Sequence, residues 1–190
     1  AGGRQETEVG AAQGRDAAES LRQADLGNGD YRNPILGGDY PDPSVIRVDS
    51  DYYMTHSSFV YYPGLLILHS TDLVNWQPVC YALHQNVGSV YAPDFVAYKG
   101  RYYIYFPAGK TNWVITAPSP KGPWSDPVDL KIGGIDPGHI VADGKRYLYM
   151  AGGNMVRLSD DGLSTIGKVF RVYDGWDIPD SLRVECKCLE

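Results

Sequence analysis

Three aspartates that stand beside prolines are the residues of this chain best suited to chemistry. They are Asp42 in PDPS, Asp94 in APDF and Asp136 in IDPG. A single Asp-Pro pair commonly only shapes a turn, but three of them, 52 and 42 residues apart, indicate a repeated site. Neighbouring carboxylates repel one another, so their pKa values separate, and such groups serve as acid and base.

Each aspartate introduces the same sequence pattern. An apolar strand follows it, then a polar turn with Asp or Gly, then a second strand that begins with aromatic residues or Arg-Tyr; the segments are 41–58, 92–109 and 135–153. The interval suits one four-stranded blade of a β-propeller, which takes roughly 40 to 50 residues. Because the innermost strands of such blades run along one axis, the aspartates at their starts are expected to converge at one end of a channel.

The remaining pattern predicts an all-β fold. Short runs of Val, Ile, Tyr and Phe alternate with turn residues, as in RYYIYFPAG and KRYLYMAGG, and helical periodicity is nearly absent. The chain has 15 tyrosines and 4 tryptophans but only 4 phenylalanines. Aromatic rings with a polar atom suit half-exposed strands, and they also suit clefts that bind sugars.

Charge and composition narrow the classes of partner. The net charge of -6 argues against nucleic acid and anionic membrane surfaces as partners and favours a neutral ligand. We expect no membrane span, since no apolar run reaches about 18 residues, and no signal peptide in the first residues, which fits a mature or truncated product. Residues 1–30 contain no aromatic residue and few large apolar ones, so we interpret them as a disordered tail or linker.

The sequence predicts no metal site and no cofactor. The cysteines Cys80, Cys186 and Cys188 form no CxxC pair, and the histidines lack metal-ligand spacing. The glycine-rich stretches GGDY and AGGNM do not match the phosphate-binding pattern GxxxxGK[ST]. Nucleotide chemistry is therefore not expected.

The repeated segments resemble glycoside hydrolase family 43, whose members are five-bladed propellers that act on arabinose- and xylose-containing glycans. The family's opening blade is similar to NPILGGDYPDPSVIRVDSDYYM. The segment after that blade is similar to SSFVYYPGLLILHSTDLVNWQPV, which contains the Ser-x-Asp-Leu-x-x-Trp pattern. YAPDFVAYKGRYYIYF and IDPGHIVADGKRYLYM resemble the second and third blades. The resemblance covers residues 31–190. It implies a partial propeller with about three blades, since a complete ring needs about 250 residues at this repeat length.

The resemblance implies roles for three carboxylates. Asp42 matches the general base, which activates a water for attack at the anomeric carbon, and Asp136 matches the carboxylate that orients the general acid and raises its pKa. The family's acid is a glutamate in a Glu-Gly-Pro-like motif. The chain ends in VECKCLE, where Glu190 is the best match and Glu185 competes with it. Inversion requires the acid and base about 6.5 to 9.5 Å apart, whereas retention requires about 5 Å, and two different blades suit the longer separation.

Three further residues are candidates for the substrate-binding site. Phe59 is expected either to form an apolar wall for a sugar ring or to pack in the core. Tyr91 stands where relatives often have Trp. Asp94 is assigned by the resemblance to the cleft or its framework and not to proton transfer, while His139 is interpreted as structural.

The resemblance thus predicts an inverting glycosidase that releases terminal xylose or arabinofuranose from pentose glycans. β-Xylosidase and α-L-arabinofuranosidase remain alternatives, and so does a non-catalytic carbohydrate-binding propeller fragment that lacks a competent acid. An oligosaccharide or polysaccharide is the expected partner, and its extracellular nature implies a secreted or periplasmic location. Open blade edges favour self-association.

Overall fold

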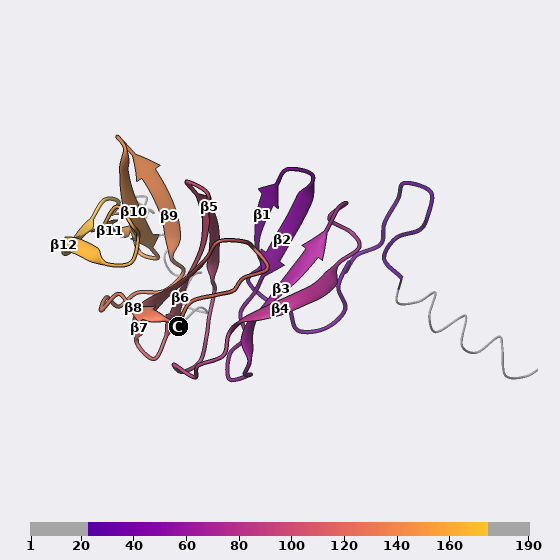
Figure 1. Cartoon of the computed structure of the whole chain (residues 1–190), viewed down its shortest axis with the longest axis horizontal. Coiled ribbons are helices and arrows are strands. Elements are labelled where there is room, and N and C mark those ends of the chain that lie inside the picture. The colour runs from indigo at the N-terminus through magenta and orange to yellow at the C-terminus, as the bar shows by residue number, and fades with distance from the viewer. Residues whose placement is uncertain (1–22, 175–190) are drawn as a thin grey trace, which may run out of the picture.

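The computed structural model of the chain describes residues 23–174. Twelve β-strands in this range form three four-stranded sheets (Figure 1). The first sheet, blade 1, comprises β1 (Ser44–Val48), β2 (Asp51–Thr55), β3 (Gly64–Ser70) and β4 (Gln77–Leu83). Blade 2 comprises β5 (Asp94–Tyr98), β6 (Arg101–Ala108), β7 (Thr111–Ala117) and β8 (Val128–Asp129). Blade 3 comprises β9 (Gly138–Ala142), β10 (Lys145–Met150), β11 (Asn154–Leu158) and β12 (Thr165–Arg171).

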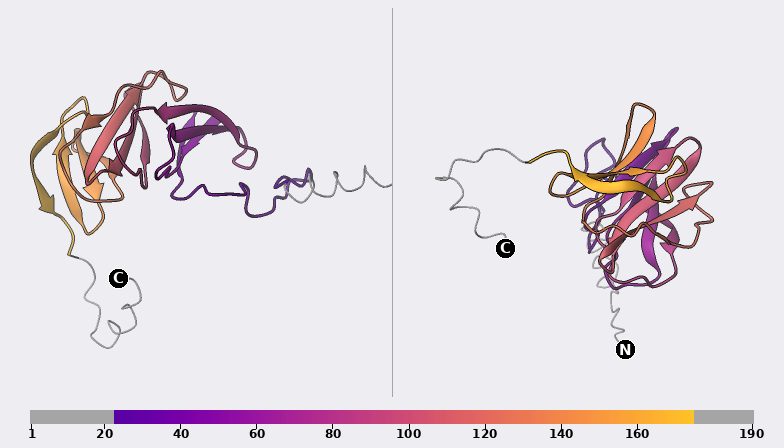
Figure 2. Two further views of the ribbon diagram at one scale, coloured as in Figure 1. Left: turned by 90° about the horizontal axis from the view of Figure 1, so that it is seen from below. Right: turned by 90° about the vertical axis from the view of Figure 1, so that its left-hand side faces the viewer.

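Every blade is an antiparallel meander, with its strands hydrogen-bonded in chain order. The blades follow one another in an open row across residues 23–174 (Figure 2). The predicted all-β fold and the partial propeller of three blades are therefore confirmed. Within the described residues there is no helix with the length and hydrophobicity that a membrane span needs.

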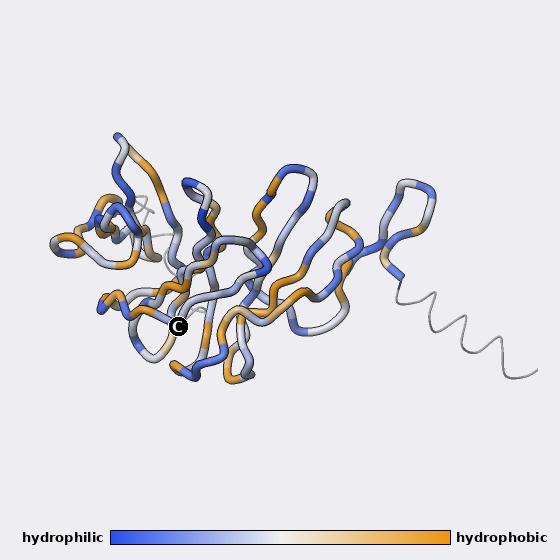
Figure 3. The backbone as a smooth tube through the Cα atoms, in the orientation of Figure 1, coloured by the Kyte–Doolittle hydropathy of each residue, from blue (hydrophilic) through white to orange (hydrophobic). Residues whose placement is uncertain are grey.

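Tight turns between the first two strands set the register of blades 2 and 3. Lys99-Gly100 and Asp143-Gly144 connect these strands, and all four residues have positive φ, at 47° and 75° and at 50° and 70° respectively. Two consecutive positive φ values define the type I′ turn, whose twist matches that of paired strands. Hydrophilic residues lie at these hairpin tips, while hydrophobic residues follow the strands (Figure 3).

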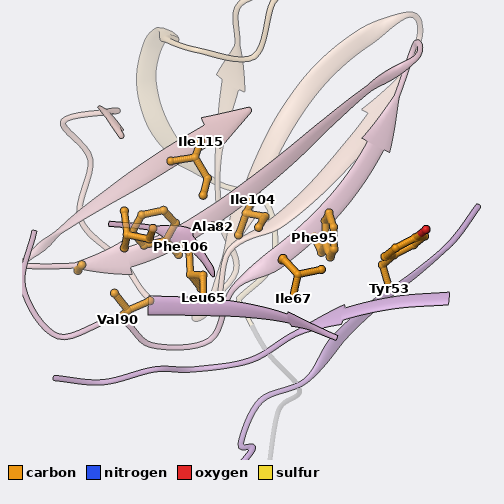
Figure 4. Packing of buried hydrophobic residues seen from close by; sticks show 11 residues of the cluster. Tyr53, Leu65, Ile67, Ala82, Val90, Phe95, Ile104, Phe106 and Ile115 are labelled. Atoms are coloured by element: carbon orange, nitrogen blue, oxygen red, sulfur yellow. The ribbon is translucent and has the colours of Figure 1, made fainter. Parts of the chain in front are cut away.

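The hydrophobic core lies between the blades. Between blades 1 and 2 it comprises eleven buried residues, which Figure 4 shows: Tyr53, Leu65, Ile67, Ala82, Leu83, Val90, Phe95, Ile104, Phe106, Ala108 and Ile115. A second cluster, between blades 2 and 3, includes Tyr103, Tyr105, Leu148 and Val156. Each fully buried Leu or Ile stabilises this packing by about 2 kcal/mol relative to exposure, so burial between sheets holds successive blades together.

The Ser-x-Asp-Leu-x-x-Trp segment builds the turn between β3 and β4. The Ser70 hydroxyl donates to Asp72, and the Asp72 carboxylate accepts the backbone N–H groups of Val74 and Asn75. The side-chain amide of Asn75, which also donates to Asp72, and these backbone hydrogen bonds hold the pKa of Asp72 far below its usual range. Trp76 is buried and donates from Nε1 to the carbonyl of Leu73. The motif therefore has a structural explanation that is independent of substrate.

The expected tail lies partly within the described residues. Residues 23–30 lead into a hydrogen-bonded loop, in which the Arg32 N–H donates to the Ala24 carbonyl and the Leu26 N–H donates to the Asp30 carbonyl. The Asn75 side chain also donates to the Asp25 carboxylate at 2.8 Å, which attaches this loop to blade 1. Residues 1–22 lie outside the described part of the chain.

Candidate active site

The first strands of the three blades begin side by side. The Phe95 N–H of β5 donates to the Ser44 hydroxyl at the start of β1, at 2.9 Å. In the same way, the His139 N–H of β9 donates to the Asp94 carboxylate at the start of β5, at 2.6 Å. We call the end of the blades where β1, β5 and β9 begin the head end.

This register corrects the expectation that the three aspartates are equivalent. Ser44, Asp94 and Gly138 are the first residues of β1, β5 and β9, so Asp42 and Asp136 stand two residues ahead of their strands. The corresponding residue of blade 2 is Ala92. Asp94 has a proline only before it, whereas Asp42 and Asp136 each have one after them, so Asp94 is displaced by two residues from the equivalent position.

Asp42 and Asp136 share a backbone conformation. Their φ angles are 52° and 54°, in the left-handed region that Asp tolerates better than most residues. Both side chains are exposed. Asp42 belongs to blade 1 and Asp136 to blade 3, and strand β5 of blade 2 lies between β1 and β9. The two carboxylates therefore lie at the head end on different blades.

A serine that the sequence reasoning missed contacts Asp42. The Ser57 hydroxyl donates to the Asp42 carboxylate at 2.6 Å, and the Ser57 N–H donates to the Pro41 carbonyl at 3.0 Å. The hairpin register would have found it: Ser44 pairs with Thr55, and extending that register by two residues brings Asp42 opposite Ser57. In blade 3 the same extension brings Asp136 opposite Ala151, whose N–H donates to the Ile135 carbonyl.

Phe59 and Tyr91 form an aromatic pair between blades 1 and 2. Their ring centroids are 5.7 Å apart in a T-shaped arrangement. Two backbone hydrogen bonds between Phe59 and Val90 hold the pair, and Tyr91 is 48% exposed. The structure thus brings these two candidates together at the head end, with one ring available to a ligand.

Two cavities lie at the head end, and the two carboxylates are near their lining residues in sequence but are not part of the linings. One of about 450 Å³ is lined by residues that include Tyr40, Ser57, Phe59 and Tyr61, and it adjoins Asp42 through Ser57. The other, of about 390 Å³, is lined by residues that include Tyr91, Lys110 and Ile135. Ile135 directly precedes Asp136. Aromatic walls with a few polar groups are the usual lining of sites for neutral polar ligands.

Asp94 has a different environment. It is half-buried, and burial raises the pKa of its carboxyl group, an effect that the hydrogen bond from the His139 N–H partly offsets. Its oxygen Oδ2 accepts this hydrogen bond, which links blade 2 to blade 3. The remaining candidates, Glu185 and Glu190, lie outside the described residues.

The molecule is thus a partial β-propeller with carboxylates, a partly exposed aromatic pair and two cavities at one end of its blades. The chain belongs to glycosyl hydrolase family 43, whose model matches residues 31–190. The resemblance read from the sequence is therefore confirmed.

The chain is similar to named members of that family. It is 38% identical over 133 residues to a non-reducing end alpha-L-arabinofuranosidase of Bacteroides ovatus, covering 62% of this chain and 25% of that protein. It is 32% identical over 177 residues to a beta-xylosidase of Bacillus subtilis, covering 76% and 33%. A crystal structure of a family 43 protein from Bacillus licheniformis superposes with a TM-score of 0.70 at 32% identity, covering 77% of this chain and 34% of that one. The chain thus spans about a quarter to a third of these relatives.

Proposed function

We propose that this chain supplies the Asp42 and Asp136 side of a glycosidase site that releases terminal xylose or arabinofuranose from pentose glycans. The observation that carries the proposal is the matched pair itself: two exposed aspartates in the same left-handed conformation, each ahead of the inner strand of its blade. Relatives named as xylosidases and arabinofuranosidases support the substrate class.

In this proposal Asp42 is the general base. Its carboxylate takes a proton from the water that attacks the anomeric carbon, while a protonated glutamate on the opposite side of the sugar donates to the departing oxygen, with inversion of configuration. Ser57 orients the base by its hydrogen bond. Glu190 is the proposed acid and Glu185 the alternative. A negative charge on Asp136 raises the pKa of a nearby carboxylic acid and so keeps it protonated.

Phe59 and Tyr91 are proposed to bind the sugar ring. Aromatic faces pack against the C–H groups of xylose or arabinofuranose, and the exposed ring of Tyr91 is open to such a contact. Since the glycans are extracellular polymers, we also propose a secreted or periplasmic location, with self-association through the open edges of the blades.

The test is hydrolysis of nitrophenyl β-xyloside and nitrophenyl α-arabinofuranoside by the chain and by Asp42→Asn. We expect the substitution to lower turnover roughly 100-fold or more, since it removes a general base, and proton NMR of the first product to show inversion. Turnover that persists at the wild-type rate in Asp42→Asn would disprove the role of Asp42.

A non-catalytic function in carbohydrate binding is the second candidate. It is favoured by one observation: the linings of the two cavities include Phe59 and Tyr91 but neither Asp42 nor Asp136. Binding of xylo- or arabino-oligosaccharides, measured by calorimetry without any hydrolysis of aryl glycosides, would favour this function.

A further inference from the structure

A buried arginine joins blades 2 and 3. Arg146 of β10 is 1% exposed. Its guanidinium donates to the hydroxyl of Tyr105 at 3.0 Å and to the carbonyl of Asp160 at 3.2 Å. It also lies against the faces of Tyr98 and Tyr103, 4.4 and 4.3 Å from the ring centroids. Three of these contacts are made with blade 2, so the side chain bridges the two blades.

Neutral groups, rather than a direct ion pair, contact the charge of Arg146. Within residues 23–174 no carboxylate oxygen lies within 4.0 Å of its nitrogen atoms. A carbonyl, a phenol and two aromatic faces surround the cation instead, and such contacts compensate for lost hydration only when their geometry is good. The position of the guanidinium is therefore closely defined.

His139 connects this cation to Asp94. Nε of Arg146 donates to Nε2 of His139 at 3.0 Å, and because arginine cannot accept, the proton of the neutral imidazole is on Nδ1. Burial and the nearby Arg146 lower the pKa of His139 to about 4, so the ring is neutral near pH 7. Its backbone N–H donates to Asp94. One residue thus binds a buried cation with its side chain and a half-buried carboxylate with its backbone.

These contacts enclose the backbone of Asp136. On one side of it, the Ile135 carbonyl accepts the Ala151 N–H at 2.9 Å. On the other side, His139 is held by Asp94 and Arg146. Between the two attachments lie Asp136, Pro137 and Gly138, and of these Gly138 already pairs with Tyr149 of β10. Movement of His139 would therefore be transmitted to Asp136 over two residues.

We propose that Asp94, His139 and Arg146 form an interblade clasp that positions Asp136 at the head end. Asp94 and Arg146 are positioning residues in this proposal, because they act on Asp136 through His139 and not on a substrate. The importance of the clasp for hydrolysis rests on the proposed function, but its structural effect on Asp136 can be measured without any activity.

The test uses amide NMR of the full 190-residue chain, with Asp94→Ala, Asp94→Asn and Ser44→Ala. Ser44→Ala is the matched control, since it removes the equivalent hydrogen bond between blades 1 and 2. Loss of a charged hydrogen bond is expected to speed exchange of the His139 amide about tenfold or more in Asp94→Ala. The Ile135 and Asp136 signals should shift as well. Asp94→Asn retains an acceptor oxygen and should restore most of the wild-type spectrum, while Ser44→Ala should shift Phe95 and leave Asp136 unchanged.

A titration of the wild-type chain gives a second measurement that needs no substitution. If the clasp transmits position, the backbone signals of Asp136 show an inflection at the midpoint of the Asp94 carboxyl group. The absence of that inflection, or unchanged Asp136 signals in a folded Asp94→Ala variant whose His139 amide exchanges faster, would overturn the proposal. Hydrolysis assays on the same samples report on the proposed function alone, so the two failures remain distinguishable.

Discussion

The Ser57 hydroxyl donates a hydrogen bond of 2.6 Å to the Asp42 carboxylate, across the hairpin that opens blade 1. Ala151 has the equivalent place opposite Asp136 in blade 3. The two aspartates therefore differ in one contact although their backbones are alike. This difference fits the proposal that Asp42 is a base and Asp136 an electrostatic partner.

Ser57→Ala is expected to lower turnover of aryl pentosides about tenfold, because a hydrogen bond to a charged group contributes about 1.5 kcal/mol or more. Release of nitrophenol at saturating substrate measures it. Ser58→Ala is the control, since the Ser58 hydroxyl accepts the Leu65 N–H and is adjacent in sequence to Ser57. An equal loss of turnover in both variants would contradict a specific role for Ser57.

Substitution of Tyr91 by Ala is expected to raise KM several-fold, with a smaller effect on kcat, because a stacked aromatic ring contributes about 1 kcal/mol to binding. Steady-state kinetics on both aryl pentosides check this result. Tyr173→Ala is a matched control, since Tyr173 is 46% exposed, against 48% for Tyr91, and lines neither of the two head-end cavities. If both variants kept the wild-type KM, Tyr91 would not contact the sugar.

Stability is expected to fall as the pH is lowered from about 6.5 to about 4. His139 has a pKa of about 4 in the folded chain and 6.5 as its ordinary value, so the unfolded chain binds more protons in this window and stability rises with pH. The full pKa shift of His139 corresponds to about 3 kcal/mol in the free energy of unfolding. Solvent screening of this half-buried ring reduces the expected loss of stability to about half of that.

Urea unfolding at pH 7 and at pH 4.5 measures the effect, with His139→Gln as the reference. The carboxyl groups are the same in both proteins, including Asp94, whose raised pKa acts with the opposite sign. The difference between the two pH dependences therefore isolates the imidazole, and equal pH dependences would show that His139 does not titrate abnormally.

Gly162→Ala is expected to destabilise the chain more than Gly144→Ala. The φ angles are 75° and 70°, so a left-handed alanine costs about 1 kcal/mol at either position. A Cβ at Gly162 would lie 2.5 Å from Cζ of Arg146 and from the Tyr105 hydroxyl, whereas one at Gly144 would have nothing within 4 Å. Overpacking adds about 1 to 3 kcal/mol. Thermal unfolding of both variants tests this ranking, and equal melting temperatures would show that the Arg146 pocket is adaptable.

Local sequence patterns are sufficient to predict the blades. Alternating apolar residues and turn signals are local features, and they repeat at intervals that predict three four-stranded units. The register of the blades can also be counted from the sequence. Asp42, Ala92 and Asp136 each stand seven residues ahead of a turn residue with positive φ, and these turn residues are Asp49, Lys99 and Asp143. Counting back from the turns separates Asp94 from the other two aspartates, because hairpin pairing is fixed by the turn.

The contacts between blades could not be predicted from the sequence, because they arise when the sheets pack against one another. The contacts of Asp94 with His139 and of Arg146 with Tyr105 join residues 45 and 41 positions apart, on different blades. No periodicity marks such pairs, because they depend on how two twisted sheets pack. A buried arginine and a paired carboxylate both resemble surface residues in sequence. Their burial follows from the stacking of blade 3 on blade 2, and that stacking gives Asp136 its place.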